Sequence, residues 1–346
     1  MKDILFYQLF EEQSSTYTYL IADLQTKEAA IIDPVWETAE RDLKLIRELG
    51  LRLMYILETH IHADHITGAS ELRKNTMAKT AASALSEVDC ADILLEDGQV
   101  ISLGEKEIKA ISTPGHTNAC MSFIFEGMVF TGDSLLIRGT GRTDFQGGSS
   151  SKLYESITQK LFSLPDETQV YPAHDYHGLS NTTIALEKKL NPRVGANRSA
   201  QDFKKIMDEL QLATPKKMHI ALPANLGCGK LEIVKTMNPQ IILGIPTVSN
   251  EDVFQKIGRV KIIDVRSFEE FSGELGHIKT AQLVTMGSEL TKFLENGDRF
   301  EEIVFICRSG KRSSQATEES IRLGYKFTSS MAGGMVNWNE KYLPKE

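Results

Sequence analysis

Four potential metal ligands lie within six residues, directly after an apolar segment of the chain. The segment 53–57 is typical of a buried strand, and it is followed by His60, His62, Asp64 and His65. A buried strand holds the residues at its end in fixed positions, and rigid scaffolds carry their chemistry on such strand-end loops. Imidazole and carboxylate groups are suitable ligands for zinc and iron. The cluster therefore predicts a metal site built on a β-sheet.

Three further strand ends carry ligands of the same kinds. Strand 107–112 leads into the turn that contains His116, the hairpin 122–130 leads to Asp133, and strand 169–174 ends on His174. A single histidine is most often structural, but seven such groups at four strand ends favour one common site. We therefore expect these residues to meet in the folded chain.

Two metal arrangements are compatible with this set of ligands. A dinuclear zinc hydrolase would use all seven groups and would activate a bridging water. A site with one metal would use fewer of them, and the remaining groups would orient the ligands. His62, Asp64, His65 and His174 are the candidates for that supporting role. The spacing of the residues leaves both arrangements open.

Length and composition narrow the class of protein. The 346 residues predict two domains. A net charge of −8 argues against nucleic-acid or membrane-surface binding, which needs a basic face. The four cysteines are scattered without a CxxC pair, which predicts no disulfide framework and a reducing compartment. No targeting segment or membrane-spanning run is evident, so we expect a cytoplasmic protein, with a homo-oligomer left open.

A second α/β unit follows a proline-containing linker at 237–250, so we expect domains at 1–244 and 245–346. Its strands at 260–266 and 302–307 bring Cys307 to a strand end, before a helix expected at 315–324. The loop between them consists of Arg308, Ser309, Gly310, Lys311 and Arg312. Cations and a helix N-terminus stabilise a thiolate, and a glycine lets backbone N–H groups turn inward. This pattern predicts a nucleophilic cysteine in an anion-binding loop.

The first part of the chain, about residues 1–230, resembles the metallo-β-lactamase superfamily, an αββα sandwich. The motifs that carry the resemblance are His60-x-His62-x-Asp64-His65, Pro114-Gly115-His116-Thr117, Thr131-Gly132-Asp133 and Pro172-Ala173-His174. Within it, the segments 132–147 and 172–178 resemble persulfide dioxygenases, the ethylmalonic encephalopathy protein family. That resemblance implies one Fe(II) per chain, held by His60, His116 and Asp133, in place of two zinc ions. It also implies that Arg142 and Tyr176 hold the glutathione part of the substrate.

Residues 250–346 resemble the rhodanese family, an α/β domain with a central parallel sheet. The loop from Cys307 to Arg312 has the six-residue length typical of sulfurtransferases, and segments 264–266, 276–278 and 333–335 also match. The resemblance implies a Cys307 persulfide as the intermediate. We expect Asp264 and Arg266 to form a structural ion pair and His277 to be structural.

Together these features predict a bifunctional sulfur enzyme. The iron site would oxidise glutathione persulfide, or a related thiol persulfide, with O2 to sulfite and free thiol. The rhodanese would move sulfane sulfur between thiosulfate and thiol, in either direction. Two alternatives stay open: a dinuclear zinc thioester hydrolase similar to glyoxalase II, and a non-enzymatic sulfur carrier or sensor.

Overall fold

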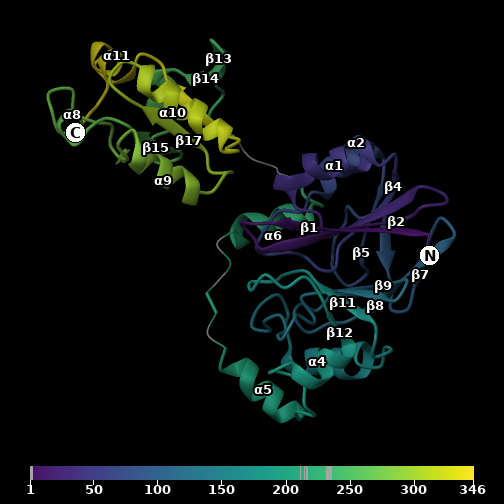
Figure 1. Cartoon of the computed structure of the whole chain (residues 1–346). Helices are drawn as coiled ribbons and strands as arrows, with labels where there is room; N and C mark the ends of the chain where they lie inside the picture. Colours follow the sequence, from purple (N-terminus) through teal and green to yellow (C-terminus); the bar gives the residue numbers. More distant parts are fainter. Residues whose placement is uncertain (1–2, 211, 214, 216, 231–235) are drawn as a thin grey trace. The chain divides into compact units, whose positions relative to one another are not determined.

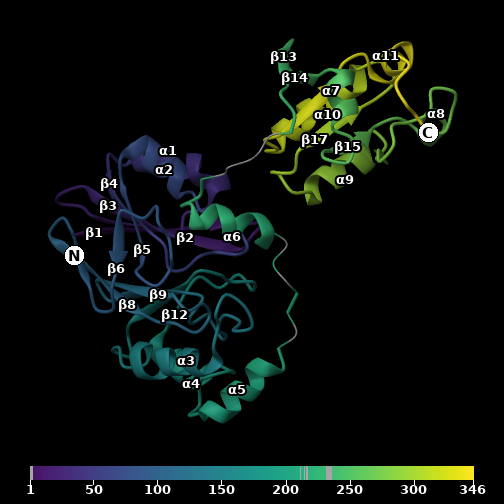
Figure 2. The ribbon, with the colours of Figure 1, turned by 180° about the vertical axis from the view of Figure 1, so that it is seen from behind.

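The computed structural model describes residues 3–210, 212–213, 215, 217–230 and 236–346. The chain forms two compact units, 1–232 and 233–346, seen from opposite sides in Figures 1 and 2. The boundary precedes the one expected at 244/245, because the backbone N–H groups of Thr236 and Met237 donate to the Glu302 carboxylate of the second unit. Among the described residues, no helix has the length and apolar character needed to cross a membrane.

The first unit contains two six-stranded sheets. The first sheet has, in order, β1 (Ile4–Glu11), β2 (Thr16–Asp23), β3 (Glu28–Ile32), β4 (Arg52–Leu57), β5 (Lys79–Ser83) and β6 (Ile93–Leu95). The second has, in order, β12 (Thr182–Thr183), β11 (Gln169–Pro172), β10 (Met128–Gly132), β9 (Met121–Phe125), β8 (Lys106–Ser112) and β7 (Val100–Leu103).

Helices cover the outer face of each sheet, which gives the predicted αββα sandwich (Figure 1). On the first sheet lie α1 (Ala39–Glu48) and α2 (Ala69–Thr76), with a 3-10 turn at Trp36–Thr38. On the second lie α3 (Ser150–Glu155), a π-helical turn at Ser156–Leu161, α4 (Ile184–Leu190) and α5 (Ala200–Asp208). Helix α6 (Met218–Leu226) follows.

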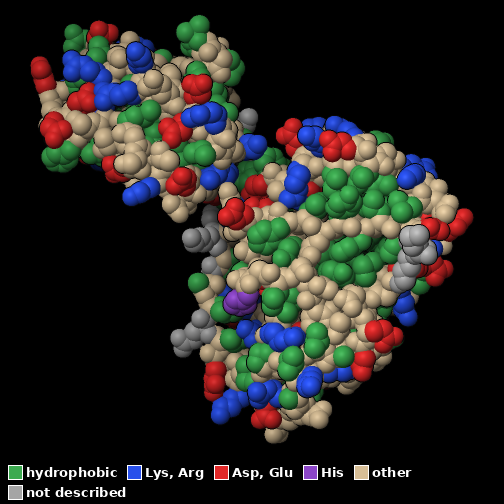
Figure 3. Space-filling model, viewed as in Figure 1, with side chains coloured by type: hydrophobic (Ala, Val, Ile, Leu, Met, Phe, Trp, Pro, Cys, Tyr) green, Lys and Arg blue, Asp and Glu red, His purple; other side chains and the backbone are tan. Residues whose placement is uncertain are grey.

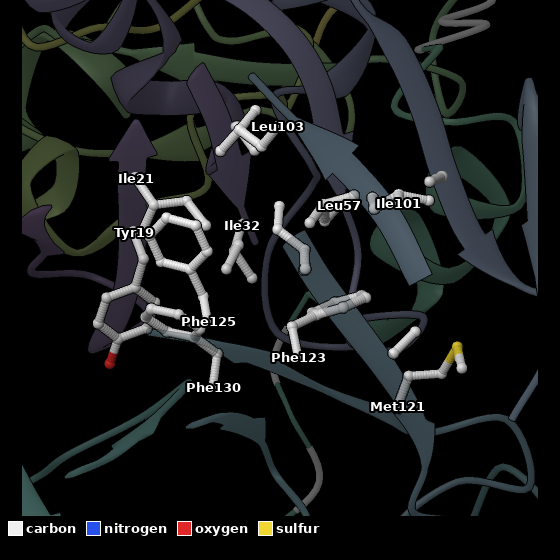
Figure 4. Close-up of a cluster of buried hydrophobic side chains, with 14 of the residues drawn as sticks. Tyr19, Ile21, Ile32, Leu57, Ile101, Leu103, Met121, Phe123, Phe125 and Phe130 are labelled. Carbon is white, nitrogen blue, oxygen red and sulfur yellow. The ribbon is translucent and has the colours of Figure 1, made fainter. Parts of the chain in front are cut away.

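The two sheets pack face to face through a large apolar core (Figure 4). Tyr19 and Ile21 of β2 point into this core, toward Phe123 and Phe130 of the second sheet. The alternate residues of β2, such as Leu20, pack instead under α1 and α2. Both faces of β2 are covered, which explains why its residues 19–22 form an unbroken apolar run.

The second unit has one sheet in the order β13 (Gln240–Ile242), β14 (Ile245–Val248), β18 (Thr328–Met331), β17 (Ile303–Ile306), β15 (Lys261–Asp264) and β16 (Gln282–Leu283). All neighbours pair in parallel except β13 and β14. Its helices are α7 (Asn250–Gln255), α8 (Phe268–Phe271), α9 (Ser288–Asn296), α10 (Lys311–Arg322) and α11 (Gly334–Glu340). The predicted parallel α/β domain is confirmed.

Part of the segment expected to be a linker is instead a hairpin. The strands β13 and β14 pair with each other, and β14 also pairs with β18 inside the sheet. Pro246 lies within β14, a position that sequence signals read as a break. The prediction of a linker across 237–250 is therefore wrong.

The cysteines also depart from the sequence prediction. Cys90 and Cys228 form a disulfide with a Cα–Cα distance of 5.9 Å, whereas Cys120 and Cys307 are free and buried. The two bonded residues are 138 positions apart. Such a separation gives no local signal, because only the tertiary fold brings the two side chains together. The sequence prediction of no disulfide framework in a reducing compartment did not anticipate this one bond.

Candidate metal centre and sulfur-transfer loop

The predicted ligands converge at the ends of strands from both sheets. His60 follows β4, His116 follows β8, Asp133 follows β10 and His174 follows β11. One ligand atom from each of His60, His116 and Asp133 lies within 4.8 Å of the others. The side chains of His60, His116 and His174 are each at least 95% buried. His60, His116 and Asp133 therefore lie close together, as we expected from their positions at strand ends.

Hydrogen bonds fix the orientation of two of these rings. His116 Nδ1 lies 2.7 Å from the carbonyl oxygen of Arg142, and His174 Nδ1 lies 3.1 Å from that of Ser15. Because a carbonyl oxygen only accepts, each Nδ1 carries a proton and donates it to the carbonyl, so Nε2 is the ring atom that can face a metal.

His60 is oriented by a relay that starts at a buried carboxylate. The Thr59 hydroxyl donates to Asp33 Oδ2 at 2.8 Å, so its oxygen accepts from His60 Nδ1 at 3.0 Å. Burial and the neighbouring imidazoles hold the pKa of His60 well below its usual value, which keeps the ring neutral. Sequence reasoning did not identify Asp33 or Thr59 in this role.

Two glycines allow the ligand-bearing loops to approach each other closely. Gly132 has φ +52°, and a Cβ at this position would lie 2.5 Å from Thr59 Oγ1. A Cβ on Gly141 would lie 2.4 Å from the Asp133 carbonyl oxygen and 2.8 Å from His116 Nδ1. The glycines next to the ligands are therefore required by the packing of the site.

The remaining ligand candidates form neighbouring groups. His62, Asp64 and His65 can also offer atoms within 4.8 Å of one another. However, His62 Nε2 lies 3.2 Å from Asp33 Oδ1 and 3.5 Å from Glu58 Oε2. Although burial opposes its charged form, these two carboxylates hold the pKa of His62 well above its usual value. His62 therefore interacts with the buried carboxylates of Asp33 and Glu58.

The donor chemistry of the three-residue group fits a metal cation. Asp133 Oδ1 is buried and makes no hydrogen bond with the described residues. A buried carboxylate oxygen without a partner is costly, and a coordinated cation would satisfy it. Two imidazoles and one carboxylate form a set that suits iron and zinc.

Asn225 binds the backbone of the loop that carries His60, His62, Asp64 and His65, which we call the metal loop. The sequence analysis assigned no role to Asn225. Its side-chain amide donates to the carbonyl oxygens of His62 at 2.8 Å and His65 at 2.9 Å. Its Oδ1 accepts from the Thr67 N–H at 2.9 Å. These three bonds fix the backbone of the loop that carries the first cluster. The Leu-Pro-Ala-Asn sequence before Gly227 was the available signal.

A pocket of about 450 Å³ opens onto the metal ligands. Tyr176 stands at its edge, 68% exposed and stacked on His174 with ring centroids 6.0 Å apart. Arg142 lies in the pocket wall, but its guanidinium is bidentate to Asp144, with both N–O distances 2.6 Å. It also donates to the carbonyl oxygens of Leu212 and Ala213. The donor set expected to receive a substrate carboxylate is therefore largely occupied.

Arg193 is a second arginine of this pocket that sequence reasoning missed. Its Nη1 donates to the carbonyl oxygen of Thr140 at 2.6 Å. Among the described arginines that line the pocket, Arg138 pairs with Glu187 and Arg142 with Asp144, while Arg193 has no carboxylate partner. A guanidinium with free donors in a pocket wall is suited to binding an anion.

In the second unit, Cys307 follows β17 and opens the predicted loop. The backbone N–H of Gly310 donates to Cys307 Sγ at 3.2 Å, and Ser313 Oγ lies 3.5 Å from the sulfur. Gly310 has φ +95°, which turns its N–H toward the sulfur before α10 begins at Lys311. Helix α10 starts earlier than the predicted 315, so its N-terminus lies directly against the loop.

The three cations of the loop have different environments. Arg312 is bidentate to Glu270, with both N–O distances 2.7 Å, and this pairing lowers the pKa of Glu270 to about 2. Arg308 and Lys311 are exposed and have no acidic partner among the described residues. Two of the three predicted cations are therefore available to an incoming anion, and the third orders the loop.

Asp264 and Arg266 form the expected structural ion pair, with both side chains fully buried. Replacing Arg266 by methionine is expected to lower the free energy of unfolding of the second unit by about 3–5 kcal/mol, because Asp264 would stay buried without a partner. The measurement is urea unfolding followed by Trp338 fluorescence in a Trp36→Phe background. Lys261→Met, which breaks the half-exposed pair with Glu301, is the matched control and should cost less than about 1 kcal/mol. Equal losses in the two variants would contradict this assignment.

The family comparisons agree with the two units. A model of the metallo-β-lactamase superfamily matches residues 12–174, and a model of the rhodanese-like domain matches residues 249–341. A solved metallo-β-lactamase from Staphylococcus aureus aligns over 96% of this chain and 99% of its own, with a TM-score of 0.67. At 22% identity, that structure supports the fold alone. The fold and site define a metal-dependent metallo-β-lactamase-type protein fused to a rhodanese domain.

Closer relatives define the family. The persulfide dioxygenases ETHE1 of Bos taurus and Homo sapiens, both named mitochondrial, are each 47% identical over 230 residues, which is 65% of this chain and 89% of theirs. The crystal structure of ETHE1 from Myxococcus xanthus is 48% identical, with a TM-score of 0.64, and covers 65% of this chain and 100% of its own. The chain belongs to the ETHE1 persulfide dioxygenase family, as the sequence resemblance predicted.

Proposed function

We propose that the first unit oxidises glutathione persulfide, or a related low-molecular-weight thiol persulfide, with O2 to sulfite and the free thiol. The observation that carries this proposal is the convergence of His60, His116 and Asp133, two rings of which are oriented by Nδ1 hydrogen bonds. The reaction consumes one persulfide, one O2 and one water, and it releases thiol, sulfite and two protons. The outer persulfide sulfur loses four electrons, and O2 accepts them.

We further propose a single Fe(II), with His60, His116 and Asp133 as its ligands. A ferrous ion held by these two imidazoles and one carboxylate would supply the redox chemistry by which O2 oxidises the persulfide sulfur. The engagement of His62 with Asp33 and Glu58 supports one metal, since that ring would otherwise serve a second ion. In this proposal Asp64, His65 and His174 are supporting groups, and Asp64 lies within 3.6 Å of His174 Nε2.

The chain's own residues bind and orient the thiol part of the substrate. Tyr176 and Arg142 remain our candidates for glutathione binding, although Arg142 could receive a carboxylate only by releasing Asp144. Arg193 adds an unpaired guanidinium in the same pocket. We propose that it binds a carboxylate of the substrate.

Replacing Arg193 by methionine is expected to raise KM for glutathione persulfide tenfold to a hundredfold with little change in kcat. A hydrogen bond to a charged group contributes about 1.5–3 kcal/mol, and each 1.4 kcal/mol is roughly a factor of ten in affinity. Steady-state O2 uptake at several persulfide concentrations measures both constants. Arg198→Met removes an exposed cation outside this pocket and is the matched control; a similar KM for both variants would argue against Arg193.

For the second unit we propose sulfur transfer through Cys307. Its thiolate attacks the outer sulfur of thiosulfate, the S–S bond to the sulfonate breaks, sulfite leaves, and a Cys307 persulfide remains. A thiol then takes the outer sulfur and regenerates the Cys307 thiolate. The same steps run in reverse when sulfite is the acceptor. Linking the two units raises the effective concentration of the shared persulfide.

Metal analysis combined with O2 uptake tests the proposed oxidation. We expect about one iron per chain, and O2 consumption with sulfite formation when glutathione persulfide is added. Two zinc ions per chain and hydrolysis of glutathione thioesters would instead identify a hydrolase. A metal-free chain without either activity would favour a sulfur carrier or sensor.

The cytoplasmic location and an oligomeric assembly remain predictions for this chain. The mammalian relatives are named mitochondrial. Acidic and basic side chains are interspersed over the face of the first unit that Figure 3 shows.

A further inference from the structure

A disulfide connects the C-terminal part of the first unit to a loop of the first sheet. Cys90 is half-buried in the segment between β5 and β6, and Cys228 lies two residues after α6. The metal-site proposal gives neither cysteine a role. Cys228 nevertheless lies beside the loop that carries His60 and His62, because one small cavity is lined by these two histidines together with Asn225 and Cys228.

The residues around Cys228 contact the metal loop directly. Asn225 makes three hydrogen bonds to the backbone of His62, His65 and Thr67. Gly229, with φ +75°, lies so close that a Cβ there would be 2.3 Å from the Thr67 carbonyl oxygen. We call residues 225–229 the clamp. Its position depends on what anchors it to the rest of the unit.

The disulfide is the covalent anchor of this clamp. Helix α6 ends within the clamp, at Leu226; it spans only nine residues and contains Pro223, so the helix contributes little rigidity by itself. Cys228 has φ +53°, a conformation that a non-glycine residue keeps only when its surroundings impose it. The bond to Cys90 supplies such a constraint from outside the segment.

We propose that the Cys90–Cys228 disulfide is a thiol-exchange site that sets how firmly the clamp holds the metal loop. A low-molecular-weight thiolate attacks the more accessible Cys90 sulfur, and Cys228 leaves as a thiolate that takes a proton from solvent. A second thiolate then attacks the mixed disulfide and releases Cys90. In total two thiols become one disulfide, and the protein gains two thiols. The link to catalysis rests on the proposed function, because its thiol product belongs to this class of reductant.

The test measures metal release from the full-length, iron-loaded protein. Iron is transferred to a chromophoric chelator before and after reduction with a phosphine, and again after reoxidation. Reduction is expected to speed release by on the order of tenfold to a hundredfold, the range found when groups that orient metal ligands are lost. Reoxidation should restore slow release. Cys90→Ser should release iron at the fast rate under both conditions.

The matched control is Glu87→Gln, an exposed change in the same loop that leaves the disulfide intact and should behave like the unmodified chain. Equal release rates before and after reduction would overturn the proposal, as would mass spectra showing both cysteines free in aerobically prepared protein. If Cys90→Ser does not fold, the reduction and reoxidation cycle of the unmodified chain still decides. Thiol-dependent release without O2 uptake would contradict the proposed oxidation and leave this inference standing.

Discussion

Replacing His116 by alanine is expected to remove iron from the first unit and to lower O2 uptake with glutathione persulfide by at least about a hundredfold. The Nε2 of His116 is one of three converging ligand atoms, and its Nδ1 is held by the Arg142 carbonyl at 2.7 Å. Loss of metal chemistry removes several kcal/mol of transition-state stabilisation, and each 1.36 kcal/mol is about tenfold in rate.

The measurements are metal content and O2 uptake on the same preparation. His177→Ala changes a histidine outside the candidate ligand groups and should retain its iron. Thiosulfate-dependent sulfur transfer should persist in His116→Ala, since Cys307 belongs to the other unit. Full O2 uptake in His116→Ala would reject the proposed ligand set.

Replacing Cys307 by serine is expected to reduce thiosulfate-dependent sulfur transfer by roughly three orders of magnitude or more. A serine hydroxyl at this position is a far weaker nucleophile than a thiolate, and the loop that supports the sulfur through the Gly310 N–H stays in place. O2 uptake on supplied glutathione persulfide should be unchanged. The measurements are sulfite release from thiosulfate and O2 uptake on the same sample.

The two variants serve as controls for each other. Each should lose one activity and keep the other, because the chain forms two separate compact units. Loss of both activities in Cys307→Ser would show that the units do not act independently.

The sequence predicted most of the architecture because its local signals were strong. Strand β2 is apolar on both faces, and the hairpin of β9 and β10 turns at Glu126 and Gly127, both with positive φ. Such patterns depend on neighbouring residues, so they can be read before the fold is known. The hairpin of β13 and β14 was missed for two reasons. A proline such as Pro246 is typical of a linker, and β18, the strand with which β14 pairs in the sheet, is distant in the sequence.

The types of ligand and the nucleophile were determined by the sequence alone. His60, His116, Asp133 and Cys307 each follow a recognisable strand, and a strand end fixes where its next residues point. Their chemistry is intrinsic to the side chains, so no tertiary information was needed to propose a metal site and a sulfur nucleophile.

The tertiary structure decided which partners surround those groups. Asp33, Asn225 and Arg193 act on the site from 27, 165 and 133 positions away from His60 (60 − 33, 225 − 60 and 193 − 60). Asp33 and Asn225 each make a few hydrogen bonds to the site, and Arg193 lacks an acidic partner among the described residues; neither feature leaves a periodic trace in the sequence. The same holds for Cys90 and Cys228, which are 138 positions apart in the sequence and meet only in the folded chain.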